Sequence, residues 1–175
     1  MRRPRHLALA LLAGCSLALP ACAGEDDEAQ QAQTTPAPAS NPQVRVSNAE
    51  DLTAKPRVEV PRDAEPPTSL RRTDLVAGDG RAVRVGDRIT VQYVGLSWST
   101  GEQFDASWDN GQPFQLTLGA GQVIPGWDRG LAGMRVGGRR LLVIPPQLGY
   151  GPQGQGPIAA NETLVFVIDL RRAGV

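Results

Sequence analysis

The sequence has very little histidine, cysteine or lysine. Its only histidine is His6, and its only cysteines are Cys15 and Cys22, while Lys55 is the single lysine among 18 cationic residues. From residue 23 onward the chain therefore has no thiol or imidazole that could act as nucleophile, general base or metal ligand, and no disulfide can form there. An enzyme built from this segment must use carboxylates, hydroxyls, aromatic rings and backbone amides, so we expect no metal and no cofactor.

The chain also lacks an excess of charge of either sign. The 18 basic residues are balanced by 18 acidic ones. A surface that binds nucleic acid needs concentrated positive charge, so no nucleic-acid partner is expected. The sequence shows no coiled-coil repeat or other dimerisation element, and a monomer is the expected state.

The first 22 residues have the features of an export signal. Arg2, Arg3 and Arg5 precede an apolar run from Leu7 to Leu12. The apolar stretch over residues 7–21 is short for a membrane-spanning helix, which needs about 20 residues. We therefore expect residues 1–22 to be a signal peptide and the protein to be exported.

The two cysteines of this segment are alternative sites for a lipid anchor. Leu12-Ala13-Gly14-Cys15 resembles a bacterial lipobox, in which a lipid is attached to the cysteine. Leu19-Pro20-Ala21-Cys22 is the rival, with a less suitable Pro20 but a polar tether after it. Simple secretion after cleavage at Ala21 or Ala23 is a third alternative. We expect an extracytoplasmic protein, either anchored to the outer face of the cytoplasmic membrane or secreted, with no other membrane contact.

Residues 23–67 are polar and rich in proline. Such a segment buries too little apolar surface to offset the entropy of ordering, which predicts a disordered linker. The alternating triplets 44–46 and 58–60 are too short to be stable alone, although the second is a candidate edge strand. Pro66-Pro67 marks the boundary of a domain over residues 68–175.

The composition changes after Leu70, since 18 of the 20 glycines and every tryptophan, tyrosine and phenylalanine lie beyond it. Residues that alternate between two faces predict strands at 88–94 and 163–170. A short strand is expected at 114–118, between glycines, and another at 139–144, where Pro145-Pro146 stops it. We expect Arg139-Arg140 to be a solvated strand end. Pro125 and the spacing of Trp127, Leu131 and Met134 predict one short helix. The fold class is therefore α+β, with an antiparallel twisted sheet of about five strands wrapped around one short α-helix.

Several short motifs follow one another in this domain. In chain order they are Tyr93-Val94-Gly95, Gly101-Glu102-Gln103-Phe104-Asp105-Ala106-Ser107, Gly111-Gln112-Pro113-Phe114, Gly119-Ala120-Gly121-Gln122-Val123-Ile124-Pro125-Gly126-Trp127-Asp128, Gly130-Leu131-Ala132-Gly133-Met134, Ile144-Pro145-Pro146, Leu148-Gly149-Tyr150-Gly151 and Thr163-Leu164-Val165-Phe166. Together they resemble the FKBP-type peptidyl-prolyl cis-trans isomerases over about Leu70 to Leu170. The order of many separate motifs makes the resemblance specific.

The resemblance implies an apolar pocket for proline, open to macrolide ligands of the family. It assigns the floor to Trp127, the rim carboxylate to Asp105, and hydrogen bonds to substrate carbonyls to the Tyr150 hydroxyl and the Ile124 N–H. The residues it implies for catalysis are Asp105, Tyr150, Ile124 and Phe104. Those it implies for substrate binding are Tyr93, Phe114, Val123, Trp127, Ile158 and Phe166. From periodicity alone, each of the aromatic residues could instead be simple core, and Asp105 could be a turn residue.

One region departs from the family pattern. Ile158-Ala159-Ala160 stands where members often carry Ile-Pro-Pro, and residues 151–157 are rich in glycine and glutamine. This departure bears on substrate preference and loop rigidity, because Ile158 still matches the residue expected at the pocket edge.

Prolyl isomerisation suits a domain without nucleophiles. The barrier of ~18–20 kcal/mol comes from lost amide resonance, and the two isomers differ by only ~0.5–1 kcal/mol. The protein needs only to bind the twisted bond better than either planar form. We expect an isomerase that acts on proline-containing exported polypeptides. The alternative is a non-catalytic proline-binding or chaperone module with the same pocket.

Overall fold

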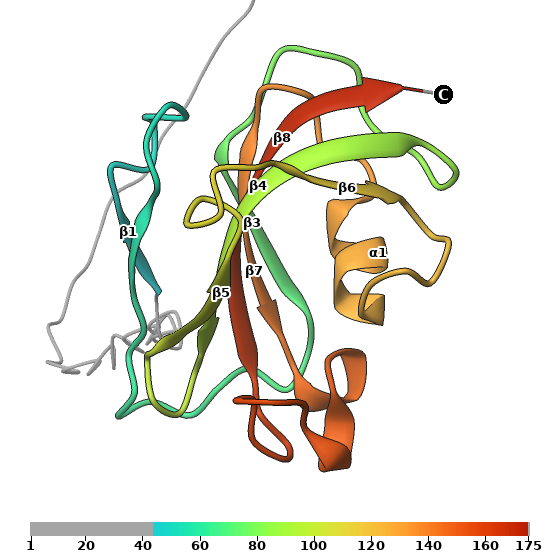
Figure 1. Cartoon of the computed structure of the whole chain (residues 1–175). Coiled ribbons are helices and arrows are strands. Elements are labelled where there is room, and N and C mark those ends of the chain that lie inside the picture. The colour runs from blue at the N-terminus through green and yellow to red at the C-terminus, as the bar shows by residue number, and fades with distance from the viewer. Residues whose placement is uncertain (1–43, 175) are drawn as a thin grey trace, which may run out of the picture. The chain divides into compact units, whose positions relative to one another are not determined.

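The computed structural model describes residues 44–174, so the expected signal and both candidate lipidation cysteines lie outside the described residues. Six antiparallel strands form one sheet in the order β3-β7-β8-β4-β5, with β6 also paired to β4. The strands are β3 (Arg71–Val76), β4 (Arg88–Ser97), β5 (Gln103–Ala106), β6 (Phe114–Thr117), β7 (Arg139–Ile144) and β8 (Leu164–Gly174). The sheet curves around the helix α1 (Pro125–Leu131), as Figure 1 shows. The predicted α+β class is confirmed.

The central strands β4, β7 and β8 are those that the sequence predicted most closely. β7 has the predicted bounds, and β4 and β8 run a few residues beyond theirs. β3 was not predicted because four of its six residues are exposed, so it has no apolar alternation. β5 was missed because it has only four residues and contains an irregular register. Within residues 44–174, no helix combines the length and apolar character needed to cross a membrane.

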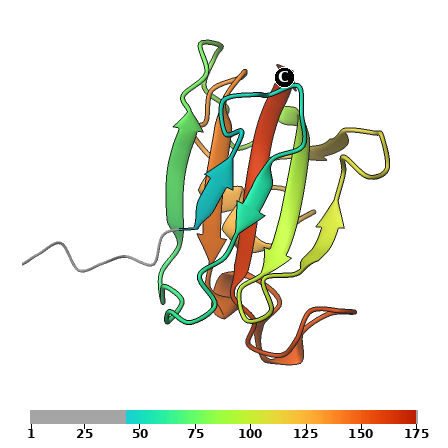
Figure 2. The same ribbon diagram turned by 90° about the vertical axis from the view of Figure 1, so that its left-hand side faces the viewer.

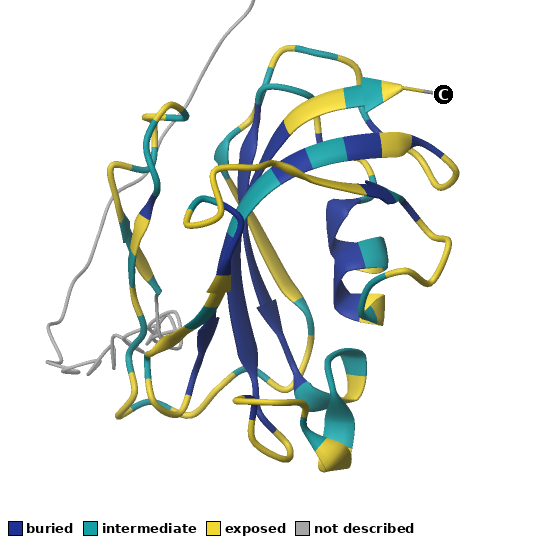
Figure 3. Ribbon diagram, in the orientation of Figure 1, coloured by how far each residue is buried: buried dark blue, intermediate teal, exposed yellow. Residues whose placement is uncertain are grey.

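The inner face of the sheet packs against α1. Trp127, Leu131 and Met134 enter one core with apolar residues of β4, β7 and β8. A Cβ on Gly126 would lie 2.3 Å from Ile144 Cγ2, and one on Gly130 would lie 2.7 Å from Leu142 Cδ1, so the glycines let the helix approach β7 closely. Figure 3 shows β7, much of β8 and much of α1 as buried.

The outer face is covered by a segment that sequence analysis assigned to the linker. β1 (Arg45–Ser47) and β2 (Arg57–Glu59) pair with each other as a separate antiparallel ribbon. We call residues 44–67 the N-terminal strap; Figure 2 looks onto the face that it crosses. Four strap valines pack against an apolar cluster of the sheet. The valines are Val44, Val46, Val58 and Val60, and the cluster is Val94, Leu96, Trp98, Ala106, Leu141, Val143, Val165 and Val167.

The prediction of disorder is therefore wrong for residues 44–67, while residues 23–43 lie outside the described residues. Each valine triplet is too short to be stable alone, as we expected, and an isolated hairpin is marginal. The triplets become ordered because they pair with each other and bury their valines on a ready-made apolar surface. Trp98 also forms a hydrogen bond to the strap, since its Nε1 donates to the Ala64 carbonyl at 3.0 Å.

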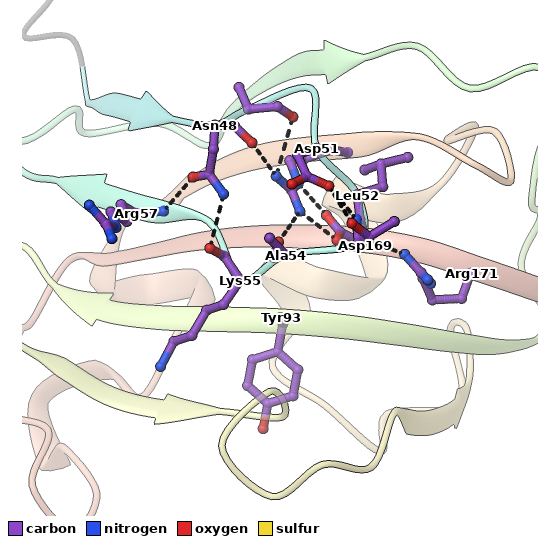
Figure 4. Close-up of polar contacts among 12 residues, drawn as sticks. Asn48, Asp51, Leu52, Ala54, Lys55, Arg57, Tyr93, Asp169 and Arg171 are labelled. Atoms are coloured by element: carbon purple, nitrogen blue, oxygen red, sulfur yellow. Dashed lines mark hydrogen bonds and ion pairs between the residues drawn. The ribbon is translucent and has the colours of Figure 1, made fainter.

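The prediction for Arg139 and Arg140 is also wrong, because both are buried. Arg139 donates to both carboxylate oxygens of Asp169, at 2.5 and 2.7 Å, and to strap carbonyls at Asn48, Ala49 and Ala54, at 2.9 to 3.3 Å. Figure 4 shows these contacts. A buried charge is tolerated when its hydrogen bonds are satisfied in this way. Arg139 thus clamps the strap to the outer face.

Arg140 makes the corresponding connection on the inner side. Its guanidinium pairs with Asp74 of β3 at 2.5 and 3.0 Å and donates to the Gly130 carbonyl at 2.7 Å. Gly130 lies in the last turn of α1, whose carbonyls have no partner within the helix. Arg140 therefore joins the edge strand to the helix end, whereas Arg139 joins the sheet to the strap.

Candidate functional site

A cavity of about 290 Å³ lies where α1 meets the inner face of the sheet. Nine of the ten predicted site residues line it. They are Tyr93, Phe104, Asp105, Phe114, Val123, Ile124, Trp127, Tyr150 and Phe166. The tenth, Ile158, is buried in the adjoining core and does not line the cavity. Residues from four strands, the start of the helix and the loop after β7 are thus brought together.

Trp127 is the most central of these aromatic residues. Its ring meets Tyr93 and Phe166 edge-on at centroid distances of 5.2 Å each, and Phe114 at 6.2 Å. The indole is only 4% exposed, so it is both a core residue and a wall of the cavity. Edge-to-face contacts hold rings in fixed orientations. The rings therefore form a rigid apolar surface.

A β-bulge explains how Phe104 and Asp105 both reach the cavity. In the pairing with β4, Leu96 faces Gln103 and Gly95 faces Asp105, so Phe104 is an extra residue. In a regular strand, neighbouring side chains point to opposite faces, and a bulge redirects one of them. Asp105 therefore lies in a strand, which excludes the alternative of a simple turn residue.

Gly95 is required beside this bulge for steric reasons. A Cβ at this position would lie 2.7 Å from Phe166 Cε1 and 2.8 Å from Phe104 Cζ. Both distances are shorter than any ordinary contact, so a larger residue would displace the rings. The Tyr93-Val94-Gly95 motif thus supplies a cavity residue and, two positions on, the space that the facing rings need.

The polar side of the cavity is made by two phenols and one carboxylate. The Tyr93 hydroxyl donates to an Asp105 carboxylate oxygen. Burial raises the pKa of Tyr93, and the hydrogen bond and charge of Asp105 raise it further. Burial also raises the pKa of Tyr150, again with a contribution from the charge of Asp105. Both phenols stay protonated at neutral pH, and Tyr150 presents a hydroxyl donor on the cavity wall.

The loop before α1 carries Val123 and Ile124, and two side chains hold it in place. Gln122 lines the cavity, and its Oε1 accepts a hydrogen bond from the Thr117 N–H at 2.8 Å. Asp128 accepts one from the Gly119 N–H, also at 2.8 Å. Sequence reasoning did not assign Gln122 to the site because a single polar residue between glycine and valine has no periodicity. Its place inside the longest motif was the one available signal.

The loop that departs from the family pattern is held by backbone hydrogen bonds. Gln155 and Ile158 exchange two of them at 2.9 Å, and the Asn161 N–H donates to the Gly151 carbonyl at 2.8 Å. A Cβ on Gly154 would lie 2.4 Å from the Ile158 carbonyl oxygen, so the turn closes tightly. These hydrogen bonds define the path of the loop that contains Ile158.

Comparison with known proteins agrees with this geometry. A family model described as FKBP-type peptidyl-prolyl cis-trans isomerase matches residues 79–171. An FK506-binding protein of Streptomyces anulatus is 54% identical over 118 residues, which cover 66% of this chain and 94% of the relative. A probable FK506-binding protein of Corynebacterium glutamicum is 47% identical over 116 residues, covering 66% and 96%.

Solved structures show the same fold. The crystal structure of AtFKBP13 is similar with a TM-score of 0.58 and 35% identity, covering 62% of this chain and 96% of that one. The crystal structure of FkpA from Escherichia coli has a TM-score of 0.56 and 40% identity, covering 61% and 48%. The family match, the relatives and the fold lead to one conclusion: this chain belongs to the FKBP-type peptidyl-prolyl cis-trans isomerases.

Proposed function

We propose that the protein isomerises Xaa-Pro bonds in exported polypeptides, and that the aromatic cavity is where it does so. Isomerase activity in general follows from the family. The observation that carries the assignment to this cavity is its lining. Rigid aromatic walls and one carboxylate surround a space of about 290 Å³, which suits a pyrrolidine ring.

The chemistry requires no covalent step. A twisted amide has less charge separation than a planar one, so an apolar surface favours it relative to water. Phe104, Trp127 and Phe166 hold the proline ring while the preceding carbonyl rotates. The cavity lowers the barrier because it binds the twisted form better than either planar isomer.

Polar groups at the cavity orient the substrate. The Tyr150 hydroxyl and the Ile124 N–H donate hydrogen bonds to substrate carbonyls. Asp105 fixes the Tyr93 phenol, since it accepts the hydrogen bond from its hydroxyl. Because burial raises the pKa of both phenols, neither loses its proton near neutral pH.

The test is spectroscopic isomerisation of a short Xaa-Pro peptide by the purified chain, with an FK506-type macrolide as competitor. The names of the relatives support this choice of ligand. Acceleration that the macrolide abolishes, and that Asp105→Asn reduces in a folded variant, would support the assignment. A folded chain that binds the macrolide without accelerating isomerisation would favour the alternative, a non-catalytic proline-binding or chaperone module.

We propose further that the protein is exported and lipid-anchored through Cys15 or Cys22. The basic start, the apolar run and the lipobox-like sequences support this. Labelling with a radioactive fatty acid in a bacterial host tests it, because Cys15→Ser and Cys22→Ser are matched controls for each other. One of the two should lose the label and accumulate precursor. Labelling that survives in both, or is absent from the wild type, would contradict a single lipid anchor.

A further inference from the structure

The N-terminal strap lies outside the matched family segment of residues 79–171, yet its Lys55 pairs with Asp109, in the turn that follows the strand carrying two cavity residues. That strand, β5, is four residues long and ends the main strand order, with β4 as its neighbour. Phe104 and Asp105 line the cavity on its inner side. Ala106 and the following Trp108 belong to the outer cluster, together with the strap valines. The strap therefore supports β5 from behind.

One carboxylate links the strap to β5. Asp109 Oδ1 pairs with Lys55 Nζ at 2.5 Å, and its Oδ2 accepts a hydrogen bond from Gln103 Nε2 at 2.8 Å. These two hydrogen bonds lower the pKa of Asp109, so it stays ionised. Gln103 immediately precedes the bulge at Phe104 and Asp105. A continuous set of contacts thus runs from the strap to the cavity rim.

Lys55 is itself held in place on the strap. Asn48 Nδ2 donates to the Lys55 carbonyl at 3.1 Å, and Asn48 Oδ1 accepts from the Arg57 N–H at 3.1 Å. Figure 4 shows the contacts of Asn48 with Lys55 and Arg57. The backbone on both sides of Pro56 is therefore fixed relative to β7 and β8, which lets the Lys55 side chain act as a defined support.

We propose that the strap is a positioning element of the proline cavity and that Lys55 is its positioning residue, acting through Asp109 and Gln103 on Phe104 and Asp105. The proposal rests on the proposed use of this cavity for proline. Lys55 does not touch the substrate. Its role is to keep the bulge of β5 in the geometry in which the ring and the carboxylate both face the cavity.

The expected effect is on binding rather than on folding. The Lys55 and Asp109 side chains are 35% and 51% exposed, and ion pairs of this kind contribute little to global stability. Loss of the Lys55–Asp109 ion pair should leave the midpoint of unfolding unchanged, while Phe104 and Asp105 are held less firmly at the cavity rim. We expect KM for an Xaa-Pro peptide to rise about threefold with kcat nearly unchanged, the size of effect that a weak ion pair can produce.

Because Lys55 is the only lysine, chemical modification tests the proposal on the unmutated chain. Acetylation removes its charge, whereas reductive methylation keeps it. Each reagent changes the chain's α-amino group in the same way as Lys55, so Lys55→Met treated with both reagents is the control for that group. The acetylated protein should show the raised KM and the methylated protein should not. Equal KM values for both modified forms would overturn the proposal.

Variants give a second, independent readout. Lys55→Met should shift the NMR amide resonances of Phe104 and Asp105, and Lys55→Arg should restore both the resonances and KM. Arg81→Met is the matched control. This variant also loses an ion pair, since Arg81 lies 2.7 Å from Asp87, and the Arg81 side chain is 43% exposed. If Lys55→Met leaves these resonances unchanged, or Arg81→Met shifts them equally, the proposal fails. The NMR result decides this even if the cavity proves not to bind proline.

Discussion

The two faces of the sheet use the same strands for different purposes. On the inner face, Tyr93 and Phe166 meet α1 and leave a cavity, whereas on the outer face Val94, Val165 and Val167 are closed over by the strap. The aromatic rings of the inner face line a cavity, whereas the valines of the outer face pack against the strap valines. A strand with period-two alternation can therefore build a binding site and a sealed core at once.

Each face also has one buried arginine from β7. Arg140 connects the helix end to β3, and Arg139 connects the strap to β8 through Asp169. Their adjacency in the sequence sends them to opposite faces. Variants on the two faces should thus separate stability from activity, and the following predictions test that separation.

The largest effect is expected from Trp127→Ala on the inner face. Truncation of a buried tryptophan costs about 3–5 kcal/mol of unfolding free energy. Because Trp127 is also a cavity wall, the remaining folded protein should lose most of its isomerase activity. Urea denaturation followed by peptide isomerisation measures both. A stable variant with full activity would exclude Trp127 as the floor of the site.

On the outer face, Arg139→Met should lower stability by a similar amount with a much smaller effect on activity. Removing one partner of a buried ion pair costs about 3–5 kcal/mol, because Asp169 is left buried without the guanidinium that satisfies both of its oxygens. Activity per folded molecule should fall only a few-fold, through the strap. The double variant Arg139→Met/Asp169→Leu should recover part of the lost stability. Loss of activity as severe as in Trp127→Ala would refute the separation of the two faces.

Gly95→Ala should produce an intermediate effect. The added Cβ would push Phe104 and Phe166 apart, and overpacking of this kind costs about 1–3 kcal/mol. Activity should fall because both rings line the cavity. Gly174→Ala in β8 is the control, since its Cβ would meet nothing closer than 3.9 Å. Equal behaviour of the two variants would mean that the rings move freely.

The smallest effect is a loss of stability at alkaline pH. The folded-state pKa values of Tyr93 and Tyr150 are raised, so the folded protein holds these protons more tightly than the unfolded chain. The contribution of these two tyrosines to the unfolding free energy should therefore be constant below about pH 10 and fall as the pH rises above it. Asp105→Asn should make the fall shallower, because the negative charge is removed. Urea denaturation at several pH values measures this, and stability that increases above pH 10 would contradict it.

The sequence was most informative where local patterns and ordered motifs coincided. It predicted the bounds of β7 and the start of α1 at Pro125, and it named nine of the residues that line the cavity. Ile158 shows the limit of a motif, because the residue is present but its side chain enters the core. Motifs specify which residues are present, but packing decides which surface each one reaches.

The outer face was missed because its cover lies far away in the sequence. Val165 and Val167 already indicated that β8 is apolar on both sides, which requires cover on both faces. Only one helix was predicted, so a second cover had to exist. The burial of Arg139 could not be predicted from β7 alone, because its partners besides Asp169 are strap carbonyls, which have no side-chain signature.

The clamp also has a consequence for the order of folding. The strap carbonyl of Asn48 is 91 residues from Arg139, and that of Leu52 is 119 residues from Arg171. Chains emerge from the ribosome N-terminus first, and contacts between distant residues form late. The strap is therefore the first part of the domain to be synthesised and the last to dock. Its docking must wait until the final strand has been added, so a docked strap marks a completed molecule.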